Sequence, residues 1–289
     1  MQRARGVALI MVLMITGVLG LLMLQIGLTA RDHVARAQLL VDRAEASLRL
    51  QSRESAMVFS LMTQEWFEGK ADQNSANPYA AKWNFRGEPF ETDAARFRIQ
   101  DIKGLFPMPQ PGDSNASFER FLVALGVDRV RAERVAEQYS EFQASDRDRR
   151  DAALLPLQAF GELRGVLELT PAELLTIESR ATLYPSSEIN PATASEAFLK
   201  TRFDETAVES LKQLRAVGGM DAVAFSKVVE KGADDLTVFY PGPALRFDID
   251  LAVSGVRFRR ESTLVVRPYA DEPLILWGRR RLDAEGAAP

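Results

Sequence analysis

The first long segment of the chain is apolar without interruption. From Val7 to Ala30 no residue carries a charge, and the first charge after Arg5 is Arg31. About 20 apolar residues cross a bilayer core as a helix, whereas the apolar stretch of a cleaved secretory signal has only about 7–15 residues. The pattern therefore predicts that residues 7–30 form a transmembrane helix.

The helical pattern continues beyond this apolar stretch. No proline or glycine occurs between Leu28 and Trp66, and apolar or small residues recur there at three- and four-residue spacings. We therefore expect one continuous helix from about Val7 to about Phe67, whose second half packs on a globular body. The positions expected on the packed face are Leu40, Ala44, Leu48, Ser55 and Phe59.

Strand-like alternation occurs before and after a long middle region. ARFRIQDI (residues 95–102) predicts a short half-buried strand. LRFDIDLAV (245–253) and VRFRRESTLVVR (256–267) flank Ser254-Gly255, which predicts an antiparallel hairpin with a two-residue turn. EPLILWGRRR (272–281) predicts either an edge strand or a packed tail.

The middle region has the helical period. Its apolar positions predict short helices over residues 118–127, 129–143, 159–166, 170–183, 193–203, 204–217 and 220–232. Thr170 precedes Glu173, and Thr193 precedes Glu196, in the spacing of a capping box. Three prolines and two glycines in KGLFPMPQPGDSNAS (103–117) favour irregular structure there. The pattern indicates an α+β fold with an inserted all-helical domain.

Composition narrows the possible chemistry. The 289 residues include no cysteine, which excludes disulfides and cysteine-based metal sites, and His33 is the single histidine. The net charge of -4 gives no basic surface for nucleic acid. No nucleotide loop, nucleophile elbow or metal-ligand spacing occurs, so we expect neither an enzyme nor a bound cofactor.

Two groups of carboxylates are candidates for metal binding or acid–base chemistry. Asp146, Asp148 and Asp151 alternate in SDRDRRD, which is expected to be a loop, and such oxygens can hold Ca²⁺. The interleaved arginines favour a solvated surface loop instead. Asp248 and Asp250 project from one face of a predicted strand, where an antiparallel sheet with one wet face needs polar residues in any case.

The segment EINPATAS (188–195) is similar to the start of a helix-hairpin-helix unit. Such a unit can bind DNA phosphates through backbone amides at a helix N-terminus. The alternative is a turn that joins two packed helices, which we favour because the chain is acidic. No nucleic-acid partner is therefore expected.

The leader region resembles a known family. A short basic stretch, Gly6, an apolar helix start and a long amphipathic continuation are similar to the leaders of type IV pilins and type II secretion pseudopilins. The resemblance implies a leader over residues 1–6, cleavage by prepilin peptidase between Gly6 and Val7, and methylation of the new N-terminus. Most members carry a glutamate at the fifth mature position, where this chain has Met11. That absence resembles the K-type minor pseudopilins (general secretion pathway protein K family).

The rest of the chain extends the resemblance. In residues 160–199, Ile189-Asn190 and Thr193-Ala194 match the family's pattern, and Pro191 departs from it at a variable position. GLFPMP stands where an earlier Ile-Asn pair is usual. The resemblance implies a pilin-like fold, in which a long N-terminal helix packs on an antiparallel sheet. Its parts would be the transmembrane segment 7–30, the remaining helix and first strand in 31–103, the helical insertion in 104–235, and the C-terminal strands in 236–289.

This resemblance implies a minor pseudopilin at the tip of the type II secretion pseudopilus, which initiates assembly for export of folded proteins. Its partners would be other minor pseudopilins in a tip complex, the major pseudopilin, prepilin peptidase and the inner-membrane assembly platform. Arg3 and Arg5 favour a cytoplasmic N-terminus with the bulk of the chain on the other side. The resemblance implies that the membrane is the inner membrane, crossed once, and that the body is periplasmic. The alternative is a signal-anchored periplasmic scaffold or binding protein unrelated to pilins.

Overall fold

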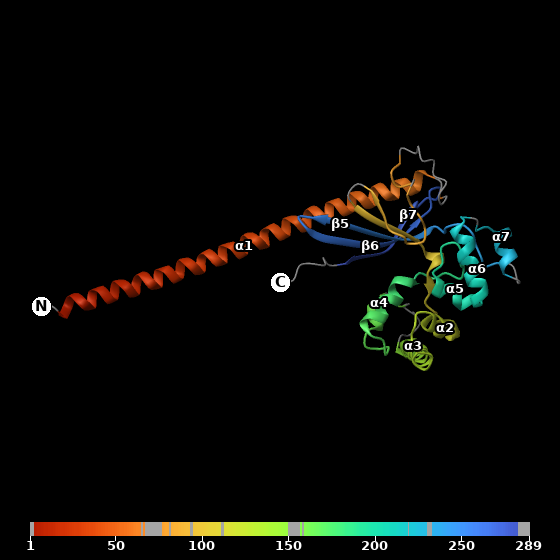
Figure 1. The fold of residues 1–289 in the computed structure, drawn as a ribbon, viewed down its shortest axis with the longest axis horizontal. Coiled ribbons are helices and arrows are strands. Elements are labelled where there is room, and N and C mark those ends of the chain that lie inside the picture. Colours follow the sequence, from red (N-terminus) through yellow and green to blue (C-terminus); the bar gives the residue numbers. More distant parts are fainter. Residues whose placement is uncertain are drawn as a thin grey trace.

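One long helix begins the structure. The computed structural model describes residues 3–64, 66, 77–80, 82–92, 95–110, 113–149, 157, 159–218, 220–229 and 233–282. Helix α1 runs from Arg3 to Thr63 without a break, and its 61 residues extend about 90 Å at about 1.5 Å per residue. Figure 1 shows its first half projecting away from the rest of the molecule. The predicted continuous helix is confirmed.

The second half of α1 packs on the body through a face that the sequence pattern missed. All five positions expected on that face are exposed: Leu40, Ala44, Leu48, Ser55 and Phe59. The buried side chains are Asp42, Ala46, Leu50, Glu54, Met57, Val58, Ser60 and Leu61. The prediction was wrong because two carboxylates lie on the packed face. Asp42 accepts a hydrogen bond there from Ser254 at 3.2 Å, and Glu54 meets Arg260 at 3.2 Å.

The body contains a five-stranded antiparallel sheet. Its strands are β1 (Phe90–Thr92), β2 (Ala95–Asp101), β5 (Ala244–Val253), β6 (Val256–Val266) and β7 (Leu274–Leu282). They lie in the order β1-β2-β5-β6-β7, and each neighbouring pair is antiparallel. The first predicted strand and the edge strand near the C-terminus are therefore confirmed, whereas β1 was not predicted.

The predicted hairpin is formed by β5 and β6. Ser254 and Gly255 have φ angles of 52° and 81° and separate the paired residues Val253 and Val256. Two positive φ angles at the centre of a two-residue loop are those of a type I′ turn, whose twist matches that of the flanking strands. Glycine adopts this backbone readily because it has no Cβ.

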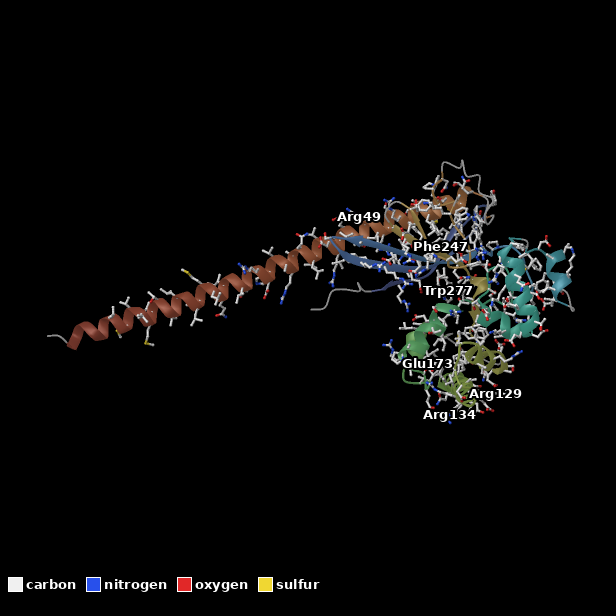
Figure 2. The ribbon with its side chains drawn as sticks, viewed as in Figure 1. Arg49, Arg129, Arg134, Glu173, Phe247 and Trp277 are labelled. Carbon is white, nitrogen blue, oxygen red and sulfur yellow. The ribbon has the colours of Figure 1, made fainter. Side chains whose placement is uncertain are left out.

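A first hydrophobic core lies between α1 and the sheet. Alternate side chains of β5, among them Phe247 and Ile249, are buried against Met57 and Leu61 of α1. Figure 2 places Phe247 beneath the second half of α1. The strand alternation therefore identified the correct apolar face of β5.

Helices form a second body beside the sheet (Figure 1). They are η1 (Ile102–Gly104), α2 (Ala116–Ala124), α3 (Arg129–Arg149), η2 (Phe160–Leu163), α4 (Pro171–Arg180), α5 (Glu196–Arg202), α6 (Glu205–Ala216) and α7 (Ala222–Val228). This body has its own core, in which Phe106 stacks on Phe121 with ring centroids 4.2 Å apart and meets Phe198 edge-on. In the chain it lies between β2 and β5, as the α+β prediction requires.

Two local predictions in this body are wrong. The proline-rich segment 103–117 is not irregular throughout, because β3 (Phe106–Pro107) pairs in parallel with β4 (Ala181–Thr182). The segment 159–166 is helical only as the short 3₁₀ turn η2. Gly165, with φ of 84°, takes a left-handed backbone that ends the helical geometry there.

Candidate functional site

The apolar half of α1 is an unpartnered surface. The helix is long and apolar enough to cross a membrane, and none of its apolar stretch is buried in the described protein. The large apolar side chains from Leu9 to Leu28 are 48% to 73% exposed. Because exposed apolar area is unfavourable in water by about 25 cal/mol per Å², this half requires lipid or other helices around it. It can serve as a single-pass membrane anchor.

The residues predicted for processing lie at the start of this half. Gly6 and Val7 belong to the first turns of α1, and Met11 follows about one turn later with its side chain 64% exposed. A carboxylate at this depth in lipid would need a positive partner, whereas a thioether needs none. Cleavage between Gly6 and Val7 and the role of Met11 stay predictions.

The buried carboxylate of Asp101 joins the helical body to the sheet. Asp101 ends β2 and has no exposed surface. Its Oδ2 accepts hydrogen bonds from Asn190 Nδ2 at 2.9 Å and from Thr193 Oγ1 at 3.0 Å. Its Oδ1 accepts the backbone N–H groups of Lys103 and Gly242, both at 3.1 Å. One side chain therefore connects the end of β2 to the 190–193 turn and to the segment that enters β5.

The electrostatics of Asp101 follow from this burial. Loss of water around the carboxylate raises its pKa, and the four donors act in the opposite direction. In the described part of the chain no arginine or lysine pairs with it. The negative charge is therefore supported by hydrogen bonds alone, so each of them matters to stability.

The turn over residues 188–195 uses its amides inside the protein. The N–H of Asn190 donates to the carbonyl of Lys103 at 3.0 Å, and that of Ser195 donates to the carbonyl of Gly104 at 3.2 Å. These groups are not available to a phosphate. The geometry therefore favours the structural interpretation of EINPATAS over the helix-hairpin-helix one.

One predicted capping box forms and the other does not. Thr170 Oγ1 accepts the N–H of Glu173, whose side chain accepts the N–H of Thr170 in return. Helix α5 is capped instead by Ser195, because the hydroxyl of Thr193 donates to Asp101. A tertiary contact thus removed Thr193 from the local role that its spacing suggested.

The calcium candidates are not brought together in the part of the chain that the structure describes. Asp146 and Asp148 belong to α3, which extends to Arg149, and not to the predicted loop. Their side chains, and all of Asp151, lie outside the described residues. Within the described ranges no group of three or more carboxylate or histidine side chains could hold a metal ion.

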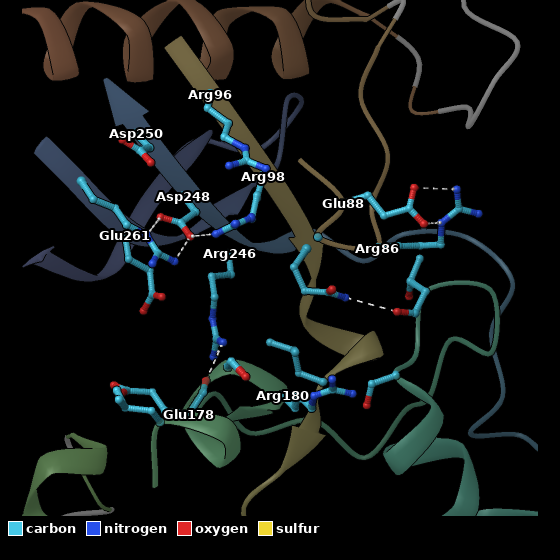
Figure 3. A pocket seen from close by; sticks show the side chains of 18 of the residues that line it. Arg86, Glu88, Arg96, Arg98, Glu178, Arg180, Arg246, Asp248, Asp250 and Glu261 are labelled. Carbon is cyan, nitrogen blue, oxygen red and sulfur yellow. Dashed lines mark hydrogen bonds and ion pairs between the residues drawn. The ribbon is translucent and has the colours of Figure 1, made fainter. Parts of the chain in front are cut away.

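Asp248 and Asp250 are engaged by arginines. Asp248 accepts from Arg98 at 3.2 Å and from Arg259 Nε at 2.6 Å, and Asp250 pairs with Arg257 at 3.3 Å. The face that they share was expected to be open to water. It instead lines a cleft toward the helical body (Figure 3).

Sequence reasoning found part of the junction and missed the rest. It singled out Asn190 and Thr193 as motif positions without assigning them a contact. It missed Asp101 and Gly104. In the sequence, Asp101 looks like an ordinary polar residue at the end of a strand. A Cβ on Gly104 would lie 2.5 Å from the carbonyl oxygen of Thr193. The turn can therefore approach this closely only because residue 104 is glycine.

The fold has a counterpart among solved structures. No protein-family profile matches the chain, and no curated protein sequence matches it either. A chain of the GspK-GspI-GspJ complex from the type 2 secretion system of enterotoxigenic Escherichia coli matches with a TM-score of 0.52 and 14% identity. The match covers 86% of this chain and 98% of that chain. At this identity it shows a shared fold, and it confirms the predicted pilin-like α+β architecture with a long N-terminal helix.

Proposed function

We propose that the chain is a K-type minor pseudopilin of a type II secretion system, which acts at the pseudopilus tip and initiates its assembly. The observation that supports this best is the shared fold, because it extends over 98% of a chain from a type 2 secretion complex. The leader around Gly6 and the unpartnered apolar half of α1 agree with it. The proposed role is association, not catalysis.

In this role α1 anchors the protein in the inner membrane with its body in the periplasm, and later packs among the helices of neighbouring subunits. Met11 leaves the subunit without the carboxylate that would meet the amine of a subunit ahead of it. The helical body lies at the end of the molecule remote from the N-terminus (Figure 1). A body of this width next to the sheet would hinder stacking of a further subunit, as a tip position requires. Its partners would be the other minor pseudopilins, the major pseudopilin, prepilin peptidase and the assembly platform.

The first experiment follows the N-terminus. Mass spectrometry of the protein from membranes should find Val7 as the first residue, with a methylated amine, only in cells with active prepilin peptidase. Gly6→Val should block this processing. Gly17→Ala is the matched control, because nothing lies within 4 Å of an added Cβ there, and it should be processed normally. An intact N-terminus in peptidase-positive cells would favour the signal-anchored scaffold instead.

The second experiment addresses the partners. After detergent extraction the mature protein should co-purify with the other minor pseudopilins of the same cells. The Gly6→Val variant should not, because its uncleaved leader keeps it out of the filament. Equal recovery of partners with both variants would count against assembly as the role of processing.

A further inference from the structure

The sheet and the helical body enclose a cleft of about 930 Å³. Helix α1 covers the opposite face of the sheet, so the cleft is separate from the anchor and its packing (Figure 3). Its wall on the sheet side is formed mainly by alternate residues of β2, β5 and β6, with Arg280 of β7 and residues 86–88. Its other wall comes from α4, from the turn before α5 and from Arg215 of α6. The proposed role in secretion does not use this surface.

The lining of the cleft is strongly cationic. Among the described residues that line it, nine are arginines and five carry carboxylates, an excess of four positive charges in a chain whose net charge is -4. Burial also raises the pKa of Glu261, which weakens one of these negative charges. Low-dielectric walls lined by charges of one sign concentrate the field and attract ions of opposite charge.

Three of these guanidinium groups form no salt bridge in the described part of the chain, Arg96, Arg180 and Arg246, although the charges of Glu261 and Asp248 lie near Arg246. The carboxylates that line the cleft form salt bridges with other arginines. Asp248, for example, pairs with Arg98 and Arg259. Figure 3 shows Arg96 and Arg98 extending from β2 toward the cleft.

Arg246 is the most constrained of the three. It crosses from β5 to the helical body and donates to the carbonyl oxygens of Glu178 at 2.9 Å and Ala181 at 2.6 Å. Its Nε is buried without an acceptor. Burial lowers the pKa of Arg246, because its charge has lost water, and the nearby charges of Glu261 and Asp248 act in the opposite direction without forming a salt bridge with it. A carboxylate of a ligand beside it could accept the hydrogen bond that Nε lacks.

The spacing of the unpaired arginines selects the kind of anion. Arg246 lies opposite Gln100 in the β2–β5 register, four residues along the strand from Arg96. Four residues of extended chain span about 13 Å, so a ligand with acceptors spaced along its length matches the two strand positions better than one small ion does. An extended polypeptide has the same rise per residue, and its carboxylates can meet guanidinium groups with paired, charge-assisted hydrogen bonds.

We propose that this cleft binds an extended acidic segment of a partner protein, whose carboxylates, about four residues apart, meet Arg96 and Arg246. A cleft of this volume is large enough for such a segment, since pockets of about 300–1,000 Å³ enclose sizeable ligands. Single-stranded nucleic acid is a poorer fit. No described lining residue is aromatic, so bases would have no stacking platform.

The test uses the full-length protein in detergent and a fluorescein-labelled peptide with glutamate at alternate positions, compared with its glutamine counterpart. Fluorescence anisotropy at low salt should show binding of the glutamate peptide only. Arg96→Gln should weaken it roughly tenfold, the usual effect of losing one charge-assisted hydrogen bond. Arg129→Gln is the matched control, because Arg129 is exposed at the start of α3, away from the cleft (Figure 2), and it should change nothing.

Arg180→Gln provides a second variant, since Arg180 is exposed and its loss should leave the fold intact. It should weaken binding in the same direction, and it decides the matter if circular dichroism shows Arg96→Gln to be unfolded. Equal binding of the two peptides, or unchanged affinity in a folded cleft variant, would overturn the proposal. The proposal would also be overturned if citrate, or a single-stranded oligonucleotide, bound more tightly than the peptide and displaced it.

Discussion

Replacement of Asp101 by alanine tests whether one buried carboxylate joins the two bodies of this protein. The substitution removes the acceptor of four hydrogen bonds. Thr193 Oγ1 keeps the carbonyl of Asn190 as an alternative acceptor at 3.4 Å, so three donors are left without a partner, of which Asn190 Nδ2 and the Gly242 N–H are buried and the Lys103 N–H is partly buried. Each such donor costs about 1–3 kcal/mol, and the removal of a desolvated charge offsets part of the sum. We expect the free energy of unfolding to fall by about 3–5 kcal/mol.

Urea unfolding of the full-length protein in detergent, followed by tryptophan fluorescence, measures this change. Trp83 is 4% exposed and reports on the core of the sheet. Asp271→Ala is the matched control, because Asp271 is exposed in the turn before β7, and it should change stability by no more than about 0.5 kcal/mol. Thr193→Ala should cost about 1 kcal/mol, and the double variant should cost less than the two single variants added together.

Two results would refute this reasoning. The first is an Asp101→Ala protein as stable as Asp271→Ala. The second is additivity of Asp101→Ala and Thr193→Ala within about 0.5 kcal/mol, because residues that share a hydrogen bond must be coupled. Either would mean that the helical body is held to the sheet by its apolar contacts and not by the Asp101 network.

Three further predictions concern other parts of the fold. Glu54→Ala should lower the free energy of unfolding by about 3–5 kcal/mol, because it leaves buried Arg260, 3.2 Å away, without its counter-charge and also removes the partner of Arg279. Burial raises the pKa of Tyr139 to about 12, so its contribution to stability should be complete below about pH 10 and be lost as the pH rises toward that value, as ultraviolet titration and unfolding measure. Gly255→Val should cost about 1–3 kcal/mol in urea unfolding, because φ of 81° strains a β-branched residue.

Each of these three has a contrary outcome. An unchanged unfolding midpoint for Glu54→Ala would mean that α1 is held by apolar packing alone. A Tyr139→Phe variant that leaves the highest-pH phase of the tyrosine titration unchanged would mean that another tyrosine titrates last. Full stability of the Gly255→Val protein would mean that the hairpin tolerates another turn.

Features that depend on residues close together in the sequence could be predicted from the sequence. The uncharged stretch from Val7 to Ala30 and the absence of proline and glycine after Leu28 determine a single long helix. The alternation on both sides of Ser254-Gly255 determines the central hairpin. In each case the deciding interaction is local: backbone bonds within a helix, or a turn that matches the twist of its strands. The apolar half of α1 was therefore predictable.

Tertiary structure alone decided which polar residues are buried. Asp42 and Glu54 face the body because Ser254 and Arg260, far along the chain, supply partners for them. The spacing of the apolar residues along α1 gives no information about those partners, so it predicted the wrong packed face.

The same reason applies to Asp101 and to the arginine-lined cleft. A charged side chain on a strand indicates a wet face only while nothing covers that face, and here the helical body does. The free energy of a buried charge depends on donors and counter-charges that the fold brings from distant segments. Periodicity along one segment contains no information about those groups. The sequence therefore determined the long helix and the hairpin, and tertiary packing determined the junction and the cleft.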